Sequence, residues 1–300
     1  MLRVNPKLTY ENKALRSFRL ALAVFAAALA GGAGTAAAQD MQQQRAPLAQ
    51  SPTYVDLVTL AERADLVIRA QIRDQITVKP ERAPGLKPGF ARLYLEGDTS
   101  ALLAGSARVS ESLAWLVDVP LDAKGKPPKL EESVVLLFAD PVAGRPGTIV
   151  LVNEQGQMPY SPALEARIRG VLTALVANDA PPVITGIADA LSVRGNLAGE
   201  SETQIFLTTR DRSPVSISVL RRPGQPPAWG VSWGEIIDSS ARAPQPGTLR
   251  WYRLACALPG ELPSSANLSR DPDARRLAEV DYAFVLRDLG ECARTITKAE

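Results

Sequence analysis

The chain has 300 residues, 46% of them hydrophobic and 22% charged, and its 34 basic residues nearly balance 32 acidic ones. This length suits one or two domains with cores large enough to fold without added crosslinks. The formal net charge of +2 gives no electrostatic reason to expect nucleic acid as a partner. The sequence contains no histidine, so the commonest general base and the commonest metal ligand are both excluded.

Residues 1–38 have the pattern of a secretory signal peptide. Basic residues precede an apolar run at 20–30, and a stretch rich in Gly and Ala ends in three alanines before a polar residue. This order of segments is typical of a cleaved export signal, and we predict cleavage between Ala38 and Gln39. The alternative is an uncleaved anchor, because residues 20–38 carry no charge, but their second half is weakly apolar for a spanning helix.

Export would change the charge balance of the protein. Cleavage removes five basic residues and one acidic residue, which leaves a mature chain of 262 residues with 29 basic and 31 acidic side chains. The formal net charge becomes −2, which favours neither nucleic acid nor an anionic membrane surface as a partner. We therefore expect a periplasmic or secreted protein that does not span a membrane after cleavage and whose partner could be a protein of the cell envelope.

Cys256 and Cys292 are the only cysteines, with 35 residues between them. In an oxidising compartment such a pair predicts a disulfide, the alternative being two buried free thiols. A chain-entropy argument gives a loop of this length about 4 kcal/mol of stabilisation, as an upper figure. The two thiols lack the further ligands of a usual zinc site, and they do not form the C-x-x-C motif of redox enzymes.

The first half of the mature chain predicts a helix followed by strands. After a polar leader at 39–52, residues 54–64 indicate a short helix capped by Ser51 or Thr53, and residues 64–73 alternate as a half-buried strand does. Turn-rich segments separate four further predicted strands, at 91–96, 113–119, 133–139 and 148–152. Five short strands after a helix suggest a closed or half-closed β-barrel, with the OB-fold as one example.

A second helix and a Pro-rich segment predict a domain boundary. Ser161 and Pro162 are typical of the start of a helix, which runs to about residue 178, and residues 180–182 then form the linker. We therefore predict two domains, at 53–179 and 183–298.

The second predicted domain follows the same plan. Its expected strands lie at 184–193, 203–209, 215–220, 229–237 and 249–256. A final helix at 271–289 is expected to have Ser269 as its cap and Gly290 as its end, and to direct inward Leu277, Val280, Phe284 and Leu286. The fold class is therefore α+β and mainly β, with two small antiparallel domains of the barrel or sandwich type, each followed by a helix.

Residues 230–234 match G-x-S-x-G, the nucleophile elbow of α/β-hydrolases, with Ser232 as the serine. That motif requires a strand, a sharp turn, a helix and a histidine as base. The chain has no histidine, and residues 228–237 alternate as one strand with Trp229 and Trp233 on one face. We therefore expect a buried strand here and not a catalytic elbow.

The other candidate catalytic and metal-binding residues are explained by ordinary structural roles. The lysines of the mature chain lie in turns or at the terminus, where desolvation would not lower their pKa for catalysis: Lys79, Lys87, Lys124, Lys126, Lys129 and Lys298. Asp271 and Asp273 suit the first turn of a helix, and Glu131 and Glu132 suit a solvated strand end. Neither acidic pair carries the further oxygen ligands of a Ca²⁺ loop. No phosphate-binding or dinucleotide-binding motif occurs, so we expect no cofactor.

Aromatic residues are scarce, at 5% of the chain, and several gather between residues 229 and 252. Such residues form either the core of a β-domain or a binding surface. Arginines flank one aromatic pair in the sequence Arg250, Trp251, Tyr252 and Arg253. We take these four residues as the best candidate for a partner surface, with a core role for Trp229, Trp233 and Trp251 as the alternative.

Several sequence blocks resemble those of a group of uncharacterised exported proteins of Gram-negative bacteria with no assigned activity. The blocks are AERADLVIRAQI (61–72), ERAPGLKPGFARLYLE (81–96), VDVPLDAKGKPPKL (117–130), WGVSWGEIID (229–238) and LRWYRLACALP (249–259). The resemblance implies export and a shared fold over nearly all of the mature chain, and it supplies no catalytic residue.

Together these features favour a non-enzymatic periplasmic protein that binds or interacts with a partner. One alternative is a hydrolase that uses carboxylates or a Ser–Lys pair, which would require ionisable side chains clustered close together. A second alternative is a carrier of a small ligand, which would require an enclosed apolar pocket.

Overall fold

A computed structural model describes residues 51–298 apart from 106–108 and 237–239. The predicted signal peptide, its cleavage site at Ala38 and Gln39, and residues 39–50 of the predicted leader lie outside this part of the chain. The described residues belong to one compact unit, which holds two antiparallel sheets. The mainly β, α+β fold class is confirmed; the division into two domains stays a prediction. No helix of the described ranges has the length and apolar character needed to cross a membrane.

The first sheet has six strands, and its order is β3-β2-β1-β4-β5 with β6 paired to β4. The strands are β1 (Leu66–Thr77), β2 (Phe90–Gly105), β3 (Ser112–Pro120), β4 (Val134–Pro141), β5 (Ile149–Leu151) and β6 (Gln157–Pro159). One parallel bridge, between Ala114 and Thr148, connects the edges of β3 and β5. Among the described residues the sheet therefore curls without forming a closed barrel, which corrects the closed form of the prediction and retains the half-closed one.

Alternation along the strands gives this sheet two apolar faces. The inner face buries Trp115, whose indole N–H donates to Gln157 Oε1 at 2.7 Å, among aliphatic side chains of β1, β2 and β4. Strand β2 pairs with β1 on one side and with β3 on the other, and β1 approaches it so closely at Gly97 that no side chain fits there. A Cβ atom at Gly97 would lie 2.6 Å from the carbonyl oxygen of Gln71 on β1.

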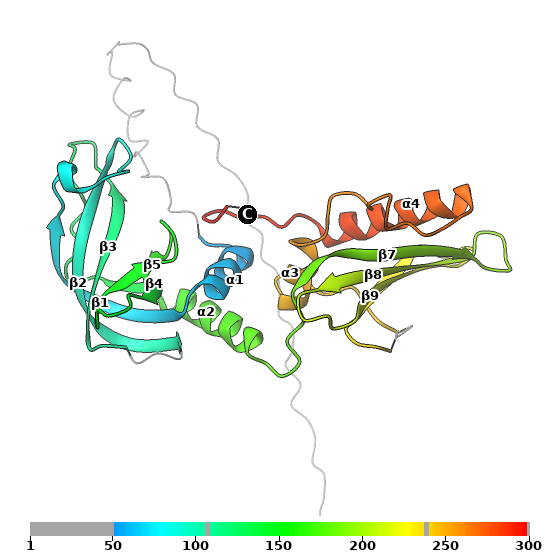
Figure 1. The fold of residues 1–300 in the computed structure, drawn as a ribbon, viewed down its shortest axis with the longest axis horizontal. Helices are drawn as coiled ribbons and strands as arrows, with labels where there is room; N and C mark the ends of the chain where they lie inside the picture. The colour runs from blue at the N-terminus through cyan, green and yellow to red at the C-terminus, as the bar shows by residue number, and fades with distance from the viewer. Residues whose placement is uncertain (1–50, 106–108, 237–239, 299–300) are drawn as a thin grey trace, which may run out of the picture. The chain divides into compact units, whose positions relative to one another are not determined.

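Helices α1 (Tyr54–Arg63) and α2 (Pro162–Leu175) pack on the outer face of β1 and β4 (Figure 1). Thr53, one of the two predicted caps, begins α1 with a capping box in which Asp56 is the second member. Ser161 caps α2 and Pro162 occupies its first turn, as predicted.

The second sheet has the order β10-β9-β8-β7 and is antiparallel throughout. Its strands are β7 (Ile184–Arg194), β8 (Ser201–Thr209), β9 (Val215–Arg221) and β10 (Ala228–Ser232). Helix α4 (Pro272–Leu289) lies along one face of this sheet (Figure 1), and its inner stripe packs on strand residues such as Ile205, Ile217 and Val219.

Two details of helix α4 differ from the prediction. Asp271 caps α4 in place of Ser269, while Gly290 ends it as expected with a φ of 73°. Val280 is 50% exposed because the buried stripe runs through Ala278, Asp281, Tyr282 and Val285 instead. The predicted buried face of α4 is wrong because Asp281, a carboxylate, is one of its fully buried residues, and a hydrophobic pattern does not identify a buried charged residue.

Residues 249–256 form a helix and not the predicted strand. Helix α3 (Leu249–Ala255) begins at Thr248, whose hydroxyl accepts the Trp251 backbone N–H at 3.2 Å. Aromatic and branched residues favour a strand here, but the cap and the packing of Trp251 and Leu254 against α4 favour the helix. The strand predicted at 229–237 ends at Ser232, and the short strand β6 was not predicted.

Candidate functional site

Helix α3 distributes the four residues of the predicted partner surface over different environments. Trp251 is 8% exposed, and its indole N–H donates to the Leu289 carbonyl oxygen at 2.8 Å. Arg253 is also buried, Tyr252 is half-buried, and Arg250 is exposed beside Asp179. The prediction of one exposed Arg/aromatic surface is therefore wrong for Trp251 and Arg253, because Trp251 packs in the core cluster that includes α4 and Arg253 pairs with Glu62 of α1.

The predicted disulfide between Cys256 and Cys292 is confirmed, with the two Cα atoms 5.1 Å apart. Cys256 is the C-cap of α3, and Cys292 lies two residues after Gly290, at the start of the C-terminal segment. The bridge therefore ties the segment after α4 to α3, which takes the place of the strand predicted at 249–256.

Removing the disulfide by the double change Cys256→Ala and Cys292→Ala should lower the free energy of unfolding by about 2–4 kcal/mol. The bridge restricts the unfolded chain, so most of the effect is expected without a change in fold. Urea unfolding of the mature protein with and without reductant measures it. The double variant serves as the control, because its unfolding midpoint should not respond to reductant; equal midpoints for oxidised and reduced wild type would contradict the prediction.

A second contact, centred on Asp56 of α1, anchors the C-terminal segment a few residues further on. The Asp56 carboxylate is fully buried, and one oxygen accepts the backbone N–H and the hydroxyl of Thr295 at 3.1 and 2.8 Å. Its other oxygen accepts the backbone N–H and the hydroxyl of Thr297 at 2.9 and 2.6 Å. The T-x-x-D spacing of the capping box could have identified Asp56 from the sequence, but nothing local indicates its partners 240 residues away.

A hollow of about 240 Å³ lies beside the disulfide, and we call it the disulfide hollow. It is lined by Thr59, Glu62, Val183, Ile184, Tyr252, Arg253, Cys256, Ala257, Arg294 and Lys298. Inside it, Arg253 Nη1 lies 2.5 Å from Glu62 Oε1, and the Tyr252 hydroxyl lies 3.3 Å from both Glu62 Oε2 and Thr59 Oγ1. Burial raises the pKa of Tyr252, so this phenol remains protonated at neutral pH. Two of the four predicted partner-surface residues thus contribute to a polar hollow.

A larger hollow of about 540 Å³ lies between the edges of β3 and β5, and we call it the seam groove. Its lining includes Tyr94 of β2, Leu116 of β3 and Val150 of β5, and the last two are 49% and 58% exposed. Arg92 and Asp118 form a two-pronged ion pair within it, with N–O distances of 2.7 and 2.8 Å. This pair holds the pKa of Asp118 below its usual range, so its carboxylate stays ionised.

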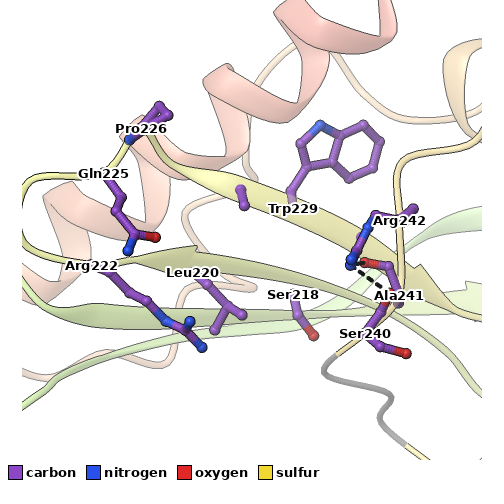
Figure 2. Close-up of a pocket in the computed structure, with 11 residues that line it drawn as sticks. Ser218, Leu220, Arg222, Gln225, Pro226, Trp229, Ser240, Ala241 and Arg242 are labelled. Atoms are coloured by element: carbon purple, nitrogen blue, oxygen red, sulfur yellow. Dashed lines mark hydrogen bonds between the residues drawn. The ribbon is translucent and has the colours of Figure 1, made fainter.

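A third hollow, of about 390 Å³, lies on the face of the second sheet opposite α4. Figure 2 shows Arg222 and Gln225 of the β9–β10 turn on one side and the segment containing Ala241 and Arg242 on the other. The side chain of Trp229 points to the other face, where its N–H donates to Asp288 at 2.6 Å. The arginines here are exposed, so the hollow is a shallow cationic surface feature.

The serine and the lysines that were candidates for catalysis occupy structural positions. Ser232 is buried at the end of β10, which fits the expected strand and not a turn that exposes a nucleophile. The six lysines at 79, 87, 124, 126, 129 and 298 are all exposed, so none is desolvated as a catalytic base would be.

The two acidic pairs, Asp271 with Asp273 and Glu131 with Glu132, also occupy ordinary structural positions. Asp271 accepts backbone N–H groups in the first turn of α4, Asp273 pairs with Arg194 at 2.8 Å, and Glu131 and Glu132 are exposed. Within the described ranges, no three acidic or cysteine side chains gather closely enough to hold a metal ion.

A buried ionic cluster that the sequence did not predict lies between α4 and the second sheet. Asp281 is fully buried, and it accepts from the Thr203 hydroxyl at 2.5 Å and from Arg221 Nε at 2.7 Å. The hydroxyl oxygens of Thr203 and Ser192 lie 3.0 Å apart, and Thr203 accepts in this pair because its one hydroxyl hydrogen goes to Asp281. Both carboxylate oxygens are committed to these donors, so the cluster positions α4 and offers no free acid for hydrolysis.

Comparison with models of known protein families and with curated proteins finds no match to this chain. The candidate sites must therefore be interpreted from their own geometry.

Proposed function

We propose that this chain is a non-enzymatic, exported binding protein of the periplasm, and that the seam groove receives an extended segment of a partner protein of the cell envelope. The single observation that carries the proposal is an open seam between two strand edges whose flanking side chains are apolar and exposed. Export itself rests on the signal-peptide pattern of residues 1–38.

The strand edges support an added strand as the form of the partner. Strand β3 pairs with β2 on one side only, β5 pairs with β4 on one side only, and the bridge between Ala114 and Thr148 joins the facing edges at one point. An incompletely paired edge offers backbone N–H and C=O groups to another chain, which then binds by continuing the sheet.

The side chains around the seam indicate what the partner segment should contain. Leu116 and Val150 would gain contacts with apolar residues at alternating positions of the incoming strand, and Tyr94 lines the same surface. The Arg92–Asp118 ion pair neutralises itself, and Arg145 and Glu154, the other two charged residues of the lining, have opposite charges, so the groove has no net charge that would select a charged partner. We therefore expect an uncharged, alternately apolar segment.

The test has two stages. Crosslinked capture from the native envelope identifies the partner of the wild-type mature protein, and titration of that partner then compares Leu116→Asp with Val280→Asp. Val280 is a matched control because it is 50% exposed on α4, against 49% for Leu116. A charge in the seam should weaken binding by about tenfold or more, since it would be buried on association, while the control should bind as the wild type does.

Hydrogen exchange distinguishes strand addition from contacts made by side chains alone. Unpaired backbone amides within 116–118 and 149–151 should exchange more slowly in the complex, because a new strand would occupy them, whereas the Ala114 N–H already donates to the Gly147 carbonyl oxygen and should change little. Failure of the wild type to capture any partner, or equal affinity for Leu116→Asp and Val280→Asp, would overturn the proposal.

A further inference from the structure

We propose that the disulfide hollow binds a small anion through a carboxylate or phosphate group, with Arg294 and Lys298 as the cationic ligands. This inference goes beyond the proposed function, since the hollow and the seam groove share no lining residue.

The first support is the charge of the lining. Arg253, Arg294 and Lys298 contribute three cations, and Glu62 is the one acid among the lining residues. Glu62 is already committed to Arg253, with the two side chains 2.5 Å apart, so that pair is neutral. Arg294 and Lys298 form no ion pair with a carboxylate in the part of the chain that is described. Two cations in one hollow that have no carboxylate partner among residues 51–298 favour an anion.

The second support is the unused hydrogen-bonding capacity of Arg294. Its Nη1 atom donates to the carbonyl oxygen and the Sγ atom of Cys292, at 3.4 and 3.1 Å. Its Nε atom is buried and has no hydrogen-bond partner in the described structure. The Nη2 atom forms no hydrogen bond within the described residues either, so the guanidinium retains donors for an anion in the hollow that it lines.

The third support is the way the chain fixes these two cations. Arg294 lies between Cys292, held by the disulfide, and Thr295, held by Asp56. Lys298 directly follows Thr297, which Asp56 also holds. The backbone at both cations is therefore ordered before any ligand arrives, and such preorganisation lowers the entropic cost of binding.

The remaining lining sets the size and character of the ligand. The hydroxyls of Tyr252 and Thr59 provide neutral polar groups, and Val183, Ile184 and Ala257 provide a small apolar wall. A volume of about 240 Å³ admits a small organic acid or a phosphate group and excludes a long polymer. We therefore infer a ligand with one anionic group and a short, partly apolar body.

Isothermal titration of the mature protein at low ionic strength tests the inference with inorganic phosphate, acetate, succinate and butyrate as probes. At least one probe should bind saturably with a stoichiometry of one, and the comparison of phosphate with the carboxylates identifies the preferred group. Arg294→Gln and Lys298→Gln should each weaken that binding by about tenfold, and added salt should weaken it further.

The control is the double variant Lys124→Gln and Lys129→Gln. It removes two positive charges, as Arg294→Gln combined with Lys298→Gln would, but it removes them from exposed positions away from the hollow. It should bind as the wild type does. If Arg294→Gln also lowers the unfolding midpoint, its loss of binding could come from a damaged fold. The affinity of Lys298→Gln then decides the outcome. Saturable binding by no probe, or wild-type affinity in Lys298→Gln, would overturn the inference, whereas Leu116→Asp should leave anion binding unchanged whether or not the partner proposal holds.

Discussion

Replacing Asp56 with alanine is expected to lower the free energy of unfolding by about 3–5 kcal/mol, because a fully buried carboxylate with several donors would be lost. Its oxygens accept from both the backbone and the hydroxyl of Thr53, Thr295 and Thr297. Alanine would leave these donors without their acceptor and would remove both the cap of α1 and the anchor of the C-terminal segment.

Urea unfolding of the mature protein measures this effect. Glu131→Ala is the control, because Glu131 is an exposed acid and its removal should change the free energy of unfolding by no more than about 0.5 kcal/mol. Proteolysis near residues 291–298 should also become faster in Asp56→Ala than in the control. Equal unfolding midpoints for the two variants would show that the anchor does not stabilise the fold.

The same carboxylate predicts a specific dependence of stability on pH. Burial raises the pKa of Asp56, but hydrogen bonds from Thr297, Thr53 and Thr295 outweigh burial and hold the pKa well below its usual range. A lowered pKa in the folded state means that the stabilisation is complete above the unfolded value of about 4 and is lost as the pH falls towards the folded value. Asp56→Asn cannot titrate, so its unfolding free energy should fall less steeply below about pH 4. Parallel pH profiles for wild type and Asp56→Asn would contradict this.

Trp251→Ala should lower the free energy of unfolding by about 3–5 kcal/mol, because it removes a buried indole from the contact between α3 and α4. The indole packs with Tyr282, Val285 and Leu289 and donates to the Leu289 carbonyl oxygen, which would lose this partner. Thermal or urea unfolding measures the loss. A binding defect in this variant would therefore report a damaged fold and not a lost contact with a partner.

Arg250→Ala is the matched control for Trp251→Ala, since it is the preceding residue of the same helix and its side chain is exposed beside Asp179. An exposed pair of this kind contributes at most about 1 kcal/mol, so this variant should unfold close to the wild type. If both variants unfolded at the same denaturant concentration, the buried position assigned to Trp251 would be wrong.

The elements that the sequence predicted well carry their signal within a few residues. Helix α2 has its cap and proline at Ser161 and Pro162, and helix α4 has its end at Gly290. Strand β1 alternates between buried and more exposed side chains from Ile68 to Arg73. Because caps, turns and periodicity are local, they could be recognised without knowing what packs against them.

Residues 249–255 illustrate a different case, in which local preference and tertiary packing disagree. Their aromatic and branched side chains favour a strand, yet burial of Trp251 and Leu254 against α4 makes the helix more favourable. The partner surface is wrong for a related reason, since Trp251 and Arg253 are buried by α4 and by Glu62 of α1, which lie far from them along the chain.

The sequence by itself determined the export pattern, the cysteine pair, the absence of histidine and the order of most helices and strands. Only the tertiary structure decided that Asp56 anchors the C-terminal segment, that Arg294 and Lys298 share a hollow with Tyr252, and that the edges of β3 and β5 leave a seam. The physical reason is that each of these features joins segments distant along the chain. Side-chain patterns within one segment indicate which face is buried, but they do not indicate which distant segment packs against that face.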